Sequence, residues 1–186
     1  MKPTVFFLPG SNETELLERL PLLLDKLIDK QFNGNTLCGI KVHFGEKGNQ
    51  TFIPADYSRV GVEFLKKRGA RPFLFETNTL YGGSRGNTIV HLNLAAEHGF
   101  SADKIDAPVV IVDGMRGENS VRVPLAGGKH VKEAILGKMI PEIPVMIGFS
   151  HFKGHMLSGF GASIKNFSMG TAARAGKLQM HSLSKP

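Results

Sequence analysis

Short runs of apolar residues alternate along this chain with longer segments in which apolar residues recur every three or four positions. Short runs that end at Gly or Pro are typical of buried strands, and the longer repeat is typical of amphipathic helices. The clearest helical repeat is in 16–28, behind the capping residues Ser11 and Asn12. The pattern predicts strands at 5–8, 37–44, 72–75, 108–112, 121–124 and 144–149, and helices at 16–28, 57–68, 87–98 and 130–140.

This alternation of strands and helices predicts the fold class. Short apolar strands separated by amphipathic helices form mostly parallel sheets that are covered by helices on both faces. A chain of 186 residues is long enough to bury one such core. We therefore expect a single three-layer α/β domain over residues 1–186, in a strand order that the pattern does not specify.

Polar side chains directly follow most of the predicted strands. His43 lies at the end of the strand at 37–44, Asn78 and Asp113 follow the next two strands, and His151 and Lys153 follow the last. In open parallel sheets, ligands bind in the crevice at the carboxyl ends of the strands. The plainer alternative is that polar residues begin most loops, whatever the loops do. Their recurrence at several strand ends favours a binding site.

The segment 81–88 has the local features of an anion-binding loop. It joins a predicted strand to a predicted helix, and it contains three glycines and Arg85. Glycines let backbone amides approach an anion, and the guanidinium adds a fork of donors. The segment lacks the glycine spacing of a dinucleotide loop and the Gly-Lys-Ser/Thr of a P-loop. A flexible turn with an exposed arginine is the alternative.

The segment 150–177 contains two His and four Lys or Arg but no Asp or Glu, and the whole chain has a formal charge of +7. Such an excess favours anionic partners. Lys153, Lys165 and Asn166 lie in this segment and are candidate ligand-binding residues. The alternative is a solvated basic surface, which is the usual role of a charged run.

The histidines suggest metal binding or proton transfer. His151 and His155 are four residues apart, but Gly154 and the preceding strand argue against the helix on which this spacing would form a metal site. His43 and His151 are also candidates for acid–base chemistry. A third metal ligand has four candidates, which are His43, His181, Asp113 and Glu46.

Cys38 is the only cysteine of the chain. It excludes an intramolecular disulfide, a Cys-rich zinc site and an iron–sulfur cluster held by several thiolates of these 186 residues. Cys38 lies in a predicted strand, so we expect it in the core. The apolar runs are too short to span a bilayer, and a signal-peptide pattern is missing at the N-terminus. We expect a cytoplasmic protein without a membrane partner.

Three stretches resemble a known family. They are VHFGEKGN (42–49), ETNTLYGGSRGNT (76–88) and HFKGHMLSGFGASIKNFSMGTAARAGKLQMHS (151–182). They resemble a widespread bacterial and archaeal family of domains of unknown function, often fused to a ferredoxin-like 4Fe-4S module. The matching polar positions are His43, Asn78, Arg85, His151, Lys153, His155, Lys165 and Asn166.

The resemblance implies an α/β domain and, in relatives, a 4Fe-4S cluster. In those relatives a run of cysteines commonly follows the motif Met-His-Ser-x-x-Lys-Pro. Here that motif occupies 180–186 with no cysteine after it, so the cysteine-rich module is absent from the sequence and Cys38 alone cannot ligate a cluster. A ferredoxin-like module or partner would then supply it.

We favour a redox-linked domain, of an oxidoreductase type, that binds a small anionic substrate or cofactor at the sheet edge. In this hypothesis His43 and His151 transfer protons or ligate a metal. Arg85, Lys153 and Lys165 balance charge, and Asn78 and Asn166 orient the ligand. One alternative is a non-catalytic scaffold that docks an acidic ferredoxin-like protein. Another is a nucleic-acid-binding module. The sequence argues against it, because it has no Trp, only two Tyr and no recognisable nucleic-acid-binding motif.

Overall fold

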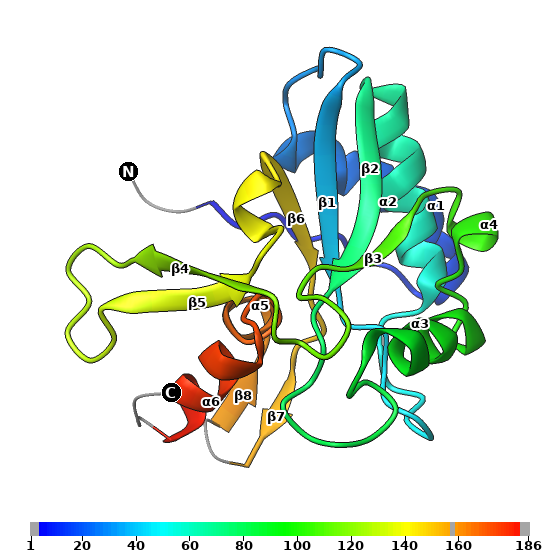
Figure 1. The fold of residues 1–186 in the computed structure, drawn as a ribbon. Helices are drawn as coiled ribbons and strands as arrows, with labels where there is room; N and C mark the ends of the chain where they lie inside the picture. The colour runs from blue at the N-terminus through cyan, green and yellow to red at the C-terminus, as the bar shows by residue number, and fades with distance from the viewer. Residues whose placement is uncertain (1–3, 157–158, 183–186) are drawn as a thin grey trace.

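The computed structural model describes residues 4–156 and 159–182. At its centre lies a four-stranded parallel sheet in the order β3-β2-β1-β6 (Figure 1). The sheet strands are β1 (Thr36–Val42), β2 (Ala70–Glu76), β3 (Val109–Ile111) and β6 (Val145–Phe149). The helices are α1 (Glu13–Leu27), α2 (Ala55–Lys67), α3 (Thr88–Glu97), α4 (Ala102–Ile105), α5 (Ser163–Ser168) and α6 (Arg174–Ser182). The predicted α/β fold class is confirmed.

The helices pack on both faces of this sheet. In Figure 1, α1 and α2 lie behind it, and Gly61 of α2 is close enough to Phe149 that an added Cβ would lie 2.8 Å from its ring. On the opposite face, α5 contacts β6 and β1 at their carboxyl ends. Because α5 covers only this end, the second face is open toward the amino ends of the strands.

The alternation of side chains along β1 separates the two faces. Cys38, Ile40 and Val42 are fully buried in the core against α2, as expected for Cys38. Gly39 and Lys41 point to the other face. A Cβ on Gly39 would lie 2.8 Å from the ring of Phe75, so the sheet needs glycine there. One strand therefore contributes to two different environments.

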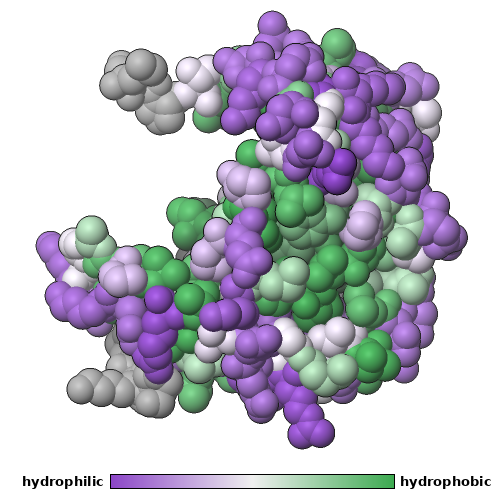
Figure 2. Space-filling model, turned by 45° about the horizontal axis from the view of Figure 1, so that its top comes forward, coloured by the Kyte–Doolittle hydropathy of each residue, from purple (hydrophilic) through white to green (hydrophobic). Residues whose placement is uncertain are grey.

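The second face is apolar. Phe75, Val112, Ile140 and Ile143 form a small buried cluster on its covered part. By register with Gly39, Leu37 and Met146 lie on the same face, with 47% and 39% of their surface exposed. Figure 2 shows hydrophobic side chains gathered in a hollow on the side of the sheet that faces the viewer in Figure 1.

Two antiparallel ribbons lie outside the sheet. They are formed by β4 (Ser120–Pro124) with β5 (Glu133–Gly137) and by β7 (Lys153–His155) with β8 (Gly159–Gly161), and a 3₁₀ turn, η1, spans Ile140–Glu142. The prediction of a helix at 130–140 is therefore wrong. The spacing of Val131, Ile135 and Met139 fits a helix, but the hydrogen bonds of this segment are instead made to β4.

The prediction of a strand at 5–8 is also wrong. The segment has no strand assignment, and 88% of Val5 and 87% of Phe7 is exposed. A β-prone run forms a strand only when a neighbouring strand pairs with it, and none of the described strands does so here. Among the described residues, no helix combines the length and apolar character needed to cross a membrane.

Candidate functional site

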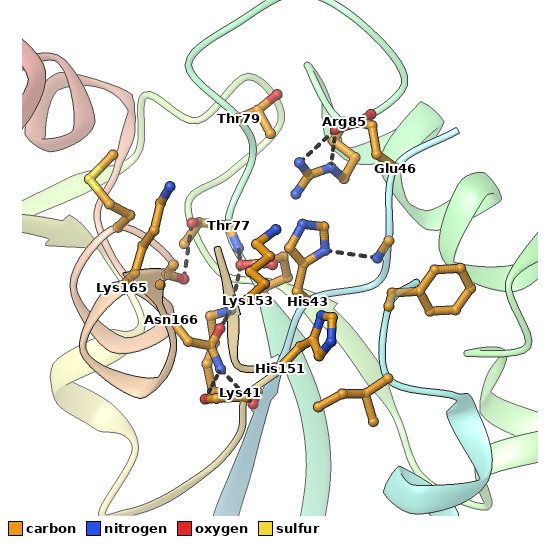
Figure 3. A pocket seen from close by; sticks show the side chains of 18 of the residues that line it. Lys41, His43, Glu46, Thr77, Thr79, Arg85, His151, Lys153, Lys165 and Asn166 are labelled. Carbon is orange, nitrogen blue, oxygen red and sulfur yellow. Dashed lines mark hydrogen bonds and ion pairs between the residues drawn. The ribbon is translucent and has the colours of Figure 1, made fainter. Parts of the chain in front are cut away.

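A pocket of about 340 Å³ opens at the carboxyl ends of β1, β2 and β6. Loops after these strands form part of its wall, and α5, α6 and the β7–β8 ribbon form the rest (Figure 3). The structure brings six of the predicted site residues into the lining of this pocket. They are His43, Arg85, His151, Lys153, Lys165 and Asn166. Separate loops converge because the strands are parallel and adjacent.

A buried ion pair forms the floor of the pocket. The Nζ atom of Lys41 lies 2.7 Å from Oε1 of Glu76, and both side chains are almost completely inaccessible. Burial alone would raise the pKa of Glu76, but Lys41 and the other positive groups outweigh it and lower the pKa to about 2. Glu76 is therefore ionised at neutral pH, and it requires the charged form of Lys41 beside it.

Asn166 of α5 fixes this pair to the end of β6. Its Oδ1 accepts a hydrogen bond from Lys41 Nζ at 2.8 Å, and its Nδ2 donates to the carbonyl of Phe149 and the hydroxyl of Ser150. Gly170 comes equally close, since an added Cβ would lie 2.6 Å from Lys41 Nζ. The amide of Asn166 is thus occupied in positioning Lys41.

His43 lies in the pocket as a neutral imidazole. The backbone N–H of Gly45 donates to its Nδ1 at 2.8 Å, so the ring carries its proton on Nε2. Burial, with the positive charge of Arg85, lowers the pKa of His43 to about 4. At neutral pH the ring can therefore donate one hydrogen bond, from Nε2.

Arg85 is already paired with a carboxylate. Its Nε and one terminal nitrogen contact Oε2 of Glu46 at 2.9 and 2.6 Å, which ties the loop after β2 to the loop after β1. The predicted anion loop at 81–88 therefore has its arginine charge balanced within the protein. Arg85 shapes the upper wall of the pocket in Figure 3.

Three lysines of the pocket lack such a partner. Lys153, Lys165 and Lys177 form no ion pair with any carboxylate of the described residues. Lys165 Nζ lies 2.5 Å from Nε2 of His155, and burial together with the charge of Lys153 lowers the pKa of Lys165. The positive charges of Lys153 and Lys165 repel each other.

Lys177 is a pocket residue that the sequence did not single out. It comes from α6, is buried, and donates to the hydroxyl of Thr77 at 2.6 Å and to the carbonyl of Ala172. Burial lowers its pKa to about 8. Lys41 was also missed, although a single charged residue within an otherwise apolar predicted strand was a usable signal.

Asn78 and His155 lie outside the pocket lining. Both donor groups of Asn78, its backbone N–H and its side-chain amide, are bound to Asp113, and the amide also donates to the carbonyl of Gly114. Asn78 is completely buried, and it joins the ends of β2 and β3. The role of Asn78 in orienting a ligand stays a prediction, and its observed contacts are internal.

The described residues contain no group of three His, Cys, Asp or Glu side chains placed to hold a metal ion. His151 lines the pocket, and His155 lies beside it in contact with Lys165, which is also a lining residue. The metal site on His151 and His155 stays a prediction.

Comparison with known proteins identifies the family. A family model described as "Domain of unknown function (DUF362)" matches residues 39–185, and the chain belongs to this family. The resemblance to a family of domains of unknown function is thus confirmed, while its link to a fused 4Fe-4S module stays a prediction. No curated protein matches the chain, and no solved structure matches it.

Proposed function

We propose that this domain binds a small anionic ligand in the pocket at the carboxyl edge of its sheet. One observation carries the proposal. Five Lys and Arg side chains line the pocket against two Glu side chains, and both glutamates are already paired, with Lys41 and with Arg85. Lys153, Lys165 and Lys177 form no ion pair with a carboxylate of the described residues, although Glu76 and Asp113 act on Lys177 at longer range.

The energetics favour an anion over water in this place. Like charges that are partly removed from solvent raise each other's free energy, and a bound anion relieves this repulsion. Hydrogen bonds between an ammonium and an anion are also shorter and stronger than neutral ones. The neutral His43 adds a donor without adding charge.

We further infer that the bound ligand is the substrate or cofactor of an iron–sulfur-linked redox reaction. The support is the likeness of the three quoted motifs to proteins fused to a ferredoxin-like module. Cys38 lies in the core away from the pocket lining, so the thiolates of a cluster would come from a ferredoxin-like module or partner. His43 and His151 are the candidates for proton transfer beside the ligand.

Anion binding is tested by calorimetric titration of the protein with inorganic phosphate and with pyrophosphate at low ionic strength. We expect saturable binding of one anion per chain. Lys165→Gln is expected to weaken it about tenfold, because one charged hydrogen bond is lost. Lys67→Gln, which removes the same charge from an exposed position on α2 outside the pocket lining, is the matched control.

Two results would overturn the proposal. One is the absence of saturable binding for both anions. The other is an equal loss of affinity in Lys67→Gln and Lys165→Gln, which would indicate a diffuse effect of net charge instead of a site.

A further inference from the structure

The pocket is lined by two chemically different sets of side chains, one charged and one apolar, and the apolar set is called the apolar wall below. Lys153, Lys165 and Lys177 contribute ammonium groups, and in Figure 3 Lys165 lies across the pocket from His43 with Lys153 between them. A second set of lining residues is apolar or aromatic. It consists of Phe52, Ile53, Leu80, Tyr81, Phe149 and Met169.

Phe52 is held in place by its neighbours. It stacks on His98 with ring centroids 4.5 Å apart and an angle of 19° between the planes. Behind it, an added Cβ on Gly45 would lie 2.6 Å from the ring, so the backbone of the loop after β1 packs directly on it. His98 is fixed in turn, since its Nδ1 lies 2.7 Å from the carbonyl oxygen of Phe44. Phe52, an aromatic member of the apolar wall, is therefore held in its position before any ligand binds.

The size of the pocket distinguishes between two kinds of anion. A water molecule occupies about 30 Å³ in the liquid, so a pocket of about 340 Å³ has room for roughly ten waters. An inorganic anion would neutralise the lysines but would leave the apolar wall in contact with water. A ligand with an apolar body fills the remaining space and displaces that water.

The charge of the pocket sets the charge of the ligand. Lys153 and Lys165 have no carboxylate partner among the described residues, and Lys177 forms no ion pair, so a group with two negative charges, such as a phosphate monoester, balances them better than a single carboxylate. Tyr81 and Phe52 both line the pocket, and flat aromatic rings pack well on such side chains.

We infer that the ligand of this pocket is an aromatic molecule with a doubly charged anionic group, bound with the anion at Lys153, Lys165 and Lys177 and the ring against Phe52 and Ile53. The inference rests on the proposed anion-binding function. To the lysines, this inference adds a second recognition element, the apolar wall. Together the two elements define the chemical class of the substrate or cofactor.

The test compares three probes of related charge by calorimetric titration. They are inorganic phosphate, methyl phosphate and phenyl phosphate, of which only the last has a ring. We expect phenyl phosphate to bind at least about tenfold more tightly than methyl phosphate. The stacking of a base on an aromatic side chain contributes a similar free energy. Phe52→Ala is expected to bring the ratio of the two affinities close to one.

Phe73→Ala is the matched control, because Phe73 is also half-buried but lies on β2 outside the pocket lining. It should retain the preference for phenyl phosphate. Ile53→Ala is a second variant of the same wall in case Phe52→Ala does not fold, and it should reduce the preference by a smaller factor.

The outcomes separate the two proposals. Equal affinity of the wild-type protein for methyl and phenyl phosphate would overturn the aromatic class and leave anion binding intact. A preference that persists in both Phe52→Ala and Ile53→Ala would also overturn it. Failure of all three probes to bind would overturn anion binding together with the inference that rests on it.

Discussion

The two faces of β1 differ in kind although they are built by alternate residues of one strand. Toward α2, the strand contributes Cys38, Ile40 and Val42 to a dry core. Toward α5, it contributes Gly39 and Lys41, and Lys41 begins the charged floor of the pocket. A shift of the strand by one residue would exchange the two sets. The same alternation that builds the core thus also builds the site.

The contrast between the core face and the pocket face of β1 separates residues that stabilise the fold from residues that are candidates for binding. The core face gains its free energy from removing apolar surface from water. The pocket face contains charges that are costly to bury, and only some of them are compensated within the protein. Lys41 and Glu76 neutralise each other within the folded structure, whereas Lys153, Lys165 and Lys177 form no ion pair among the described residues and are the residues that the proposed ligand would contact.

The largest expected effect is on the buried pair. Lys41→Met should lower the free energy of unfolding by about 3–5 kcal/mol, because it leaves the carboxylate of Glu76 buried without its cation. Urea denaturation at neutral pH measures the loss. The double variant Lys41→Met, Glu76→Leu should recover most of it, since no buried charge then remains. A loss below about 1 kcal/mol for Lys41→Met would show that the pair does not contribute in this way.

A smaller effect is expected at the margin of the core, where His91 of α3 is completely buried against Phe44. Burial lowers the pKa of His91 from 6.5 to about 4, and the pKa of His43 to the same value. The unfolded chain therefore binds these protons at higher pH than the folded protein does. Stability is complete above pH 6.5 and is lost as the pH falls toward 4, by roughly 2 kcal/mol per histidine at pH 5.

Urea denaturation between pH 7.5 and pH 5 measures this dependence, and His91→Leu is the informative variant. It should remove about half of the loss, because His43 still titrates. Neither ring nitrogen of His91 has a hydrogen-bond partner among the described residues, so the variant should not lose a bond. If His91→Leu had the same pH dependence of stability as the wild-type protein, His91 would not be a source of that dependence.

The smallest expected effect is at the exposed end of the pocket. Lys153→Gln should change the free energy of unfolding by less than about 0.5 kcal/mol, because the side chain forms no ion pair with the described residues. The same denaturation experiment measures it, and Lys129→Gln on the β4–β5 turn is the control for loss of one charge. A destabilisation as large as that of Lys41→Met would remove the distinction between the paired and unpaired lysines.

The apolar pattern predicted most of the sheet. The segments at 37–44, 72–75, 108–112 and 144–149 each overlap one of the four parallel strands, since buried strands need continuous apolar runs. The pattern failed at 130–140, because spacing that suits a helix also suits a twisted strand. Only the pairing of β5 with β4 decided between them.

The candidate site was predicted in part for a similar reason. His43 and His151 follow adjacent parallel strands, so the polarity of the sheet brings them to one edge. The contacts of Asn78 could not be anticipated, because its partner Asp113 is 35 residues away in sequence. The isolated charge of Lys41 in an apolar strand was a usable signal, but the sequence does not show that Glu76 is its partner.

The sequence by itself determined the α/β class, the polar strand ends and the excess of positive charge, since each follows from local composition and spacing. The tertiary structure alone decided which charges are neutralised. Pairing depends on distances of a few ångströms between residues far apart in the chain, such as Lys41 with Glu76 and Arg85 with Glu46. For that reason only the folded protein distinguishes Lys41, which pairs with a carboxylate, from Lys153, Lys165 and Lys177, which form no ion pair among the described residues.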